Sequence, residues 1–134
     1  MPSVLIVEDE VLTALMYQEE LENDGWTVVG PAYDLARAHR FLDAGFPDAA
    51  LLDINLQGEL VWPVAARLHE ARVPFLFVSA HSDRTYASPR FARGYERLDK
   101  PVHIHQLIAR LAIIGGTQPR PQQRDTGRDQ FAAR

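Results

Sequence analysis

The chain has 134 residues, a formal net charge of −4 and no cysteine. Its length suits one domain with a substantial core. The negative charge offers no broad basic surface for nucleic acid, and the lack of cysteine excludes disulfides and fits a reducing compartment. No apolar run approaches the about 20 residues needed to span a bilayer. We therefore expect a cytoplasmic protein that binds neither membrane nor nucleic acid.

Strand-like and helix-like segments alternate along the first 115 residues. Short apolar runs predict five strands, at residues 3–7, 27–32, 49–53, 75–80 and 95–99. Apolar residues at helical spacing predict four helices, at residues 10–23, 34–44, 61–71 and 102–114. Residues 82–93 have few apolar positions and contain Ser88-Pro89, so we expect a short, irregular or mobile helix there.

The apolar stripes of the helices predict which residues face the core. In the first helix the stripe consists of Val11, Leu12, Leu15, Met16 and Leu21. In the second, Asp34 can cap the helix, and the inward residues are Leu35, Ala38, Phe41 and Leu42. In the last helix they are Ile104, Leu107, Ile108 and Leu111.

This alternation predicts an α/β fold of the doubly wound, flavodoxin-like (βα)5 type, with five parallel strands and helices on both faces. Pro31 cannot donate to a strand ladder, which places the second strand at an edge. Right-handed crossovers then favour the strand order 2-1-3-4-5. We expect one domain over residues 1–115. Residues 116–134, rich in Gln, Pro and Arg, should form a flexible or weakly ordered tail.

Polar residues stand at the ends of four of these strands. Glu8 and Asp9 follow the first strand, Asp53 ends the third, Ser79 lies in the fourth, and Lys100 follows the fifth. In a parallel sheet these ends meet at one edge, where the winding direction reverses. Clustered carboxylates repel one another unless a cation lies among them, and oxygen ligands suit Mg²⁺. A carboxylate nucleophile, a cation, an ammonium and a hydroxyl together predict phosphoryl transfer to Asp53.

Each residue alone has a simpler explanation. Glu8 and Asp9 could cap the following helix, and Ser79 could be an ordinary hydrogen-bonded hydroxyl. Lys100 is the only lysine in the chain, which could reflect genome composition. The arrangement of all these residues at consecutive strand ends favours a shared function.

These residues resemble the receiver domain of two-component response regulators, which has the CheY-like fold. The resemblance covers residues 2 to about 114 and rests on VEDE at 7–10, LLDINL at 51–56 and DKP at 99–101. It implies that Asp53 accepts a phosphoryl group from a sensor histidine kinase, assisted by Ser79 and Lys100. It also implies Mg²⁺ as cofactor, bound by Glu8, Asp9, Asp53 and the backbone carbonyl of Asn55, and a cis bond before Pro101.

One position departs from the family pattern. Arg97 stands where most receivers carry a Tyr or Phe that turns inward on activation, and an arginine cannot be buried in that place without a partner. Residues 74–81 resemble the PFxFATGY motif of the alphaproteobacterial FAT GUY receivers, which are single-domain regulators; a kinase of the HWE or HisKA2 type would fit that subfamily. We therefore predict that phosphorylation reorganises residues 79–93 directly.

The resemblance implies a stand-alone regulator, because the tail is too short for an effector domain. Output would come from binding another protein, from acting as a phosphate sink that removes phosphoryl groups from a shared kinase, or from dimerisation. The protein is expected to be a monomer or a weak dimer through the fourth helix, fifth strand and fifth helix. No enzymatic activity is expected beyond phosphoryl transfer to itself and autodephosphorylation.

The main alternative is an interaction module on the same fold that works without phosphorylation. A small Mg²⁺ phosphatase would need a second Asp where Asn55 stands, and Met1 argues against a domain cut from a hybrid kinase.

Overall fold

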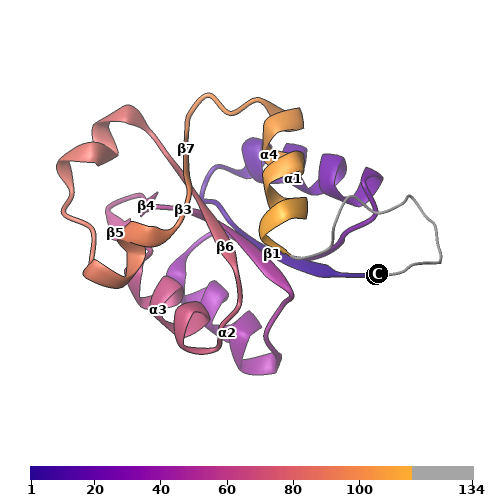
Figure 1. Ribbon diagram of the computed structural model, residues 1–134, viewed down its shortest axis with the longest axis horizontal. Coiled ribbons are helices and arrows are strands. Elements are labelled where there is room, and N and C mark those ends of the chain that lie inside the picture. The colour runs from indigo at the N-terminus through magenta and orange to yellow at the C-terminus, as the bar shows by residue number, and fades with distance from the viewer. Residues whose placement is uncertain (116–134) are drawn as a thin grey trace.

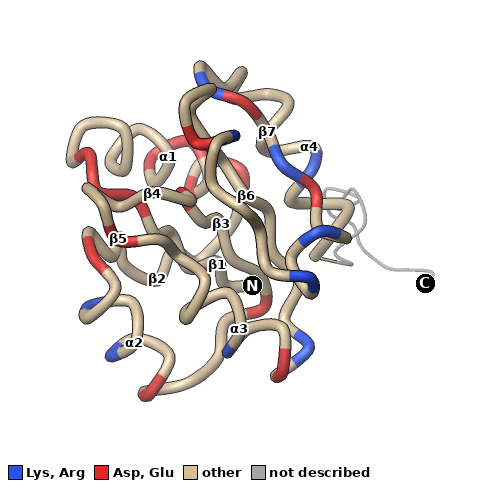
Figure 2. Tube along the Cα trace, turned by 90° about the vertical axis from the view of Figure 1, so that its left-hand side faces the viewer, with Lys and Arg blue, Asp and Glu red and all other residues tan. Residues whose placement is uncertain are grey.

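A computed structural model describes residues 1–115 of the chain. The expected tail, residues 116–134, lies outside the described residues. Basic and acidic residues are interspersed along the described chain, as Figure 2 shows. In this part of the chain no helix is both long and apolar enough to cross a membrane.

A five-stranded parallel sheet forms the centre of the molecule. Its strands are β1 (Ser3–Val7), β2 (Thr27–Ala32), β3 (Ala49–Asp53), β6 (Phe75–Ser79) and β7 (Arg97–Asp99). Their order across the sheet is β2-β1-β3-β6-β7. This confirms the predicted order 2-1-3-4-5, including the edge position of the strand that contains Pro31. The winding direction therefore reverses between β1 and β3.

A short hairpin follows β3, between the predicted strand at residues 49–53 and the predicted helix at residues 61–71. It pairs β4 (Asn55–Leu56) with β5 (Glu59–Leu60). The two residues between them, Gln57 and Gly58, have φ angles of 55° and 97°. Two successive positive φ angles are typical of a tight hairpin turn. The hairpin projects from the same edge of the sheet as Asp53.

In the described part of the chain, four α-helices cover the two faces of the sheet, as Figure 1 shows. On one side lie α1 (Val11–Asn23) and α4 (Ile104–Ile114), and on the other α2 (Leu35–Ala44) and α3 (Trp62–Glu70). Alternate residues of the central strands pack into two separate apolar clusters, one per face, as the two-residue repeat of a strand requires. The predicted doubly wound α/β fold is therefore confirmed.

The stretch 82–93 has the irregular structure that the sequence predicted. It contains two 3-10 helices, η1 (His81–Thr85) and η2 (Arg90–Gly94), in place of a full α-helix. Pro89 directly precedes η2 and lacks a backbone N–H for a continuous helix. The segment is held to the sheet through Ala92, which is buried, and through Tyr95, whose ring stacks on Phe75 at 3.8 Å between centroids.

The predicted core face of α1 is wrong. Leu12 is 78% exposed, and Val11, Leu15 and Met16 are also exposed. The buried residues are instead Ala14, Tyr17 and Leu21, so Leu21 alone of the predicted stripe lies in the core. Both sets have helical spacing, and the short Ala14 side chain allows the helix to approach the sheet closely on its own face. In α2 and α4 the predicted stripes are confirmed: Ala38, Leu42, Leu107 and Leu111 are buried, and Leu35, Phe41, Ile104 and Ile108 pack against them.

Candidate functional site

Three carboxylates meet where β1 and β3 end. The pairing of Val7 with Leu52 places the residues that follow each strand next to one another. Oxygen atoms of Glu8, Asp9 and Asp53 all lie within 4.8 Å of one another. Glu8 and Asp53 are only 1% and 4% exposed. The structure thus brings together the acidic residues that the sequence predicted at this edge.

Lys100 places its ammonium group between two of these carboxylates. Its Nζ lies 3.3 Å from Asp53 Oδ2, to which it donates a hydrogen bond, and 3.3 Å from Glu8 Oε1. The residue directly follows β7, and its backbone N–H donates to the carbonyl of Ser79 at 2.9 Å. The bond to Pro101 is cis, as the family resemblance implied. The only lysine in the chain therefore bridges the acidic cluster.

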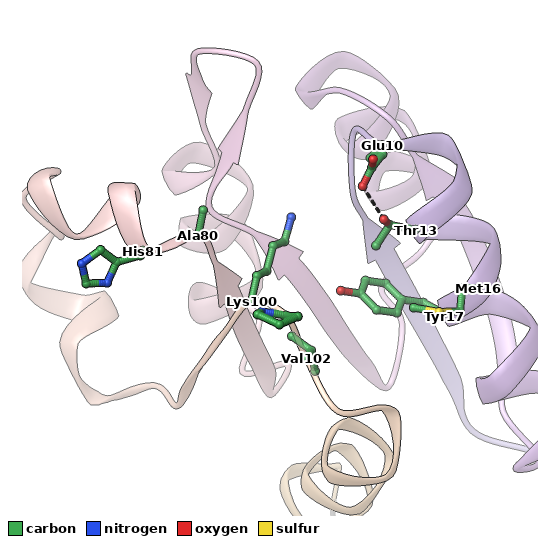
Figure 3. Close-up of a pocket in the computed structure, with 9 residues that line it drawn as sticks. Glu10, Thr13, Met16, Tyr17, Ala80, His81, Lys100 and Val102 are labelled. Atoms are coloured by element: carbon green, nitrogen blue, oxygen red, sulfur yellow. Dashed lines mark hydrogen bonds between the residues drawn. The ribbon is translucent and has the colours of Figure 1, made fainter.

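A pocket of about 400 Å³ opens beside Lys100, between α1 and the ends of β6 and β7. Figure 3 shows the Lys100 side chain and the Tyr17 ring extending into this space from opposite sides. Burial, followed by the charge of Glu8, raises the pKa of Tyr17 to about 12. Tyr17 is a site neighbour that the sequence reasoning missed; the spacing of Ala14, Tyr17 and Leu21 was the signal that could have revealed it.

Burial dominates the ionisation of the cluster. It raises the pKa of Asp53 to about 8, and Glu8 adds to this rise while Lys100 opposes it. Burial also raises the pKa of Glu8. For Lys100 burial favours the neutral amine, but the charges of Asp53 and Glu8 outweigh it and raise the pKa to about 12. One ammonium is thus too little positive charge for the cluster, and a further cation would favour the ionised form of Asp53.

The donor set fits a hard divalent cation. Glu8 Oε2 accepts a hydrogen bond from the backbone N–H of Glu10 at 3.0 Å. Glu8 Oε1 is buried and lacks any hydrogen-bond partner, although the Lys100 ammonium lies nearby. A buried carboxylate oxygen with a spare lone pair, beside two other carboxylates, is what Mg²⁺ coordination requires. The carbonyl of Asn55 remains a predicted ligand.

Ser79 lies fully buried at the end of β6, but its hydroxyl bonds to an arginine. Ser79 Oγ accepts a hydrogen bond of 2.9 Å from Arg97 Nε. This bond supplies a partner for the arginine that replaces the usual aromatic residue. No hydrogen bond joins the Ser79 hydroxyl to Asp53 among the described residues. The structure therefore brings Ser79 to the predicted edge of the sheet, where its hydroxyl is bonded to Arg97 instead of to the acidic cluster.

A buried carboxylate connects the site to η1. Asp83 is 3% exposed, and its Oδ2 accepts a 2.9 Å hydrogen bond from the backbone N–H of Ala80. Its Oδ1 is the acceptor of a long, 3.5 Å bond from the Asn55 side chain. The sequence reasoning missed Asp83. The available signal was its place three residues after Ala80, where an acidic side chain commonly satisfies the start of a helical turn.

The family model for the response regulator receiver domain matches residues 4–112. The fold, the strand order and the acidic cluster at the β1–β3 edge agree with this match. The chain belongs to the response regulator receiver domain family.

Related proteins agree with this assignment. The solution structure of SdrG from Sphingomonas melonis Fr1 is 36% identical, with a TM-score of 0.72, covering 85% of this chain and 96% of that one. A putative response regulator from Chloroflexus aurantiacus is 25% identical, with a TM-score of 0.73, covering 86% and 98%. The transcriptional regulatory protein TcrA of Mycobacterium tuberculosis is 34% identical over 131 residues. That match covers 92% of this chain but 51% of TcrA, so the chain spans about half the length of this curated relative.

Proposed function

We propose that the protein is a response regulator that accepts a phosphoryl group on Asp53 from a sensor histidine kinase. One observation carries the proposal: Asp53 lies in a buried acidic cluster with Lys100 Nζ 3.3 Å from its carboxylate. A buried carboxylate held beside an ammonium is both oriented for attack and supplied with charge for the product. The match to the receiver family supports this assignment.

In the proposed reaction an Asp53 oxygen attacks the phosphorus of a phosphohistidine. The bond from phosphorus to the histidine nitrogen breaks as the bond to Asp53 forms, and the kinase histidine leaves. Mg²⁺, held by Glu8, Asp9, Asp53 and the carbonyl of Asn55, would neutralise the phosphoryl oxygens when bound. Lys100 keeps its proton throughout, because its pKa is raised, and stays close to the charge on the phosphoryl group.

The output segment in this proposal is the stretch that contains η1 and η2. It is joined to the site by Asp83 and by an ion pair between Arg84 of η1 and Asp99 of β7. Asp99 pairs in the sheet with Ser79 and precedes Lys100. A phosphoryl group, which adds about −1.5 to −2 charge units near neutral pH, would shift these bonds and change the exposed surface of residues 79–93.

We further propose a stand-alone, cytoplasmic regulator of the FAT GUY type that acts by protein binding or as a phosphate sink. The partial match of residues 74–81 to the PFxFATGY motif supports the subfamily, and with it a kinase of the HWE or HisKA2 type. The lack of cysteine fits the reducing cytoplasm. A monomer or a weak dimer through the surface of β7, α4 and the η1–η2 segment is part of the same proposal.

Acetyl phosphate tests the acceptor function without a kinase. The protein is incubated with acetyl phosphate and Mg²⁺, and its intact mass is measured. We expect one phosphoryl adduct in the wild type and in Asp43→Asn, a control that alters an exposed carboxylate paired with Arg67. Asp53→Asn should gain none. A wild type without an adduct would favour the interaction module that works without phosphorylation. An Asp53→Asn protein with the same adduct would mean that another residue accepts the phosphoryl group.

A further inference from the structure

Arg97 carries a positive charge at a partly buried position, where an unpaired charge destabilises the folded state. Its guanidinium uses Nε for the Ser79 hydroxyl, but its Nη2 is buried and has no hydrogen-bond partner. A buried donor without an acceptor destabilises the folded state, and more strongly when the group is charged. Such a donor calls for an acceptor other than the described residues, such as a water, an ion or a bound group in a functional site.

The other partly buried arginine of the described chain provides a comparison. Arg67, on α3, donates from Nη2 to Asp43 and from Nη1 to the carbonyl of His39. Arg97 has no carboxylate within ion-pairing distance among the described residues. It is therefore a positive charge whose counter-ion is not provided by the part of the protein that the structure describes.

The Arg97 side chain reaches the edge of the sheet that carries the proposed phosphoryl site. In the β6–β7 register Arg97 pairs with Phe77, and its side chain extends along the strands to Ser79, at the sheet edge where Asp53 lies. Ser79 accepts the bond from Arg97, and no bond in which its hydroxyl donates is present among the described residues. The hydroxyl hydrogen of Ser79 and the Nη2 hydrogens of Arg97 thus lack acceptors among the described residues, at the sheet edge where β3 ends in Asp53.

We infer that Arg97 is a positioning residue of the phosphoryl site, holding the Ser79 hydroxyl through Nε and lending its unpartnered Nη2 to the phosphoryl group on Asp53. This inference rests on the proposed function. A phosphoryl group brings three strong acceptor oxygens, enough for Lys100, Ser79 and Arg97 together. Because Arg97 is bonded to Ser79, a shift of either side chain toward the phosphoryl group would carry the other with it.

The lifetime of the phosphoryl group tests this role. The protein is phosphorylated with acetyl phosphate and Mg²⁺, the donor is removed, and loss of the adduct is followed by intact mass. We expect Arg97→Met to lose its phosphoryl group about tenfold faster than the wild type, the effect of one charge-assisted hydrogen bond. Arg97→Lys should fall in between, because an ammonium keeps the charge without the planar donor set. Arg67→Met, the matched control, should keep the wild-type rate.

A second measurement observes Arg97 in the wild type and does not depend on a variant that folds. The ¹⁵N–¹H signal of Arg97 Nε is assigned through its loss in Arg97→Lys. We expect this signal to shift when beryllofluoride and Mg²⁺, a phosphoryl mimic, are added, and to keep its position in Asp53→Asn.

Two results separate the inference from the proposed function. If the wild type accepts phosphate but Arg97→Met and Arg97→Lys lose it at the wild-type rate, or the Nε signal stays in place, Arg97 is only structural and the inference is wrong. If the wild type gains no adduct and the mimic changes no signal, the proposed function itself is wrong and the inference is lost with it.

Discussion

The ionisation of Asp53 is the residue-scale feature that most directly affects reactivity. Its pKa is raised to about 8 without metal, mainly by burial, so the folded protein binds this proton more tightly than the unfolded chain. Unfolding then releases a proton between about pH 4 and pH 8, and the free energy of unfolding falls as pH rises through this range. We predict this decline in urea titrations with a chelator, and a flatter profile for Asp53→Asn. A metal-free stability that rises from pH 5 to 8 would contradict it.

Lys100 is the second residue whose effect has a clear sign. Lys100→Met removes the ammonium that lies 3.3 Å from both Glu8 and Asp53. Two buried carboxylates then lose their counter-charge, so we expect a loss of about 2 kcal/mol of stability at pH 8 without metal. Mg²⁺ should restore part of the loss because it supplies positive charge to the same oxygens. Urea titrations with and without Mg²⁺ check this, and equal losses in both conditions would argue against a metal site here.

At the residue scale the sequence predicted the acidic cluster and Lys100 correctly, because parallel strands place their ends at one edge whatever the details of packing. It could not predict the Ser79–Arg97 bond or the role of Asp83. Those contacts depend on side-chain directions across two strands and on a loop of irregular structure. No repeating pattern in the sequence encodes either of them.

At the scale of elements, α1 shows how a helical pattern can mislead. Val11, Leu12, Leu15 and Met16 satisfy helical spacing as well as the true inward face does. The small Ala14 and the long Tyr17 decide which face of α1 packs on the sheet. A prediction from hydrophobicity alone misses this face, because both residues are less hydrophobic than leucine.

The orientation of α1 makes a simple mutational prediction. Leu12→Gln changes a side chain that is 78% exposed, so the stability should change by no more than about 0.5 kcal/mol. Leu21→Ala removes a fully buried side chain and should cost about 2–5 kcal/mol. Thermal and urea unfolding measure both. Comparable losses of stability in the two variants would mean that Leu12 also faces the core, as the sequence predicted.

The attachment of η1 gives a prediction about local stability. Asp83→Ala leaves the Ala80 N–H without its acceptor and removes the contact to Asn55. We expect faster hydrogen exchange over residues 80–94, with little change in β1 and β3, because the lost bonds are local. Unphosphorylated Asp43→Asn is the control and should exchange like the wild type. Unchanged exchange over 80–94 in Asp83→Ala would mean that the segment is held by Ala92 and Tyr95 instead.

At the scale of the whole molecule, the fold follows from the alternation of strand and helix segments and from the turn residues between them. The site follows from the fold, because the fold brings the strand ends together. The five strands, their order and both helical layers were predictable because hydrophobic periodicity and Pro31 specify them. For the η1–η2 segment the sequence predicted irregular structure but not its form, because this stretch has no regular pattern of apolar residues.

Chemical mapping of the acyl phosphate shows whether Asp53 is the residue that becomes phosphorylated. Protein treated with acetyl phosphate and Mg²⁺ is reduced with borohydride, which converts an aspartyl phosphate to homoserine, and its peptides are sequenced by mass spectrometry. We predict homoserine at position 53 and at no other aspartate. Homoserine at Asp9 or Asp99, or at no position in a protein that carries the adduct, would contradict the account.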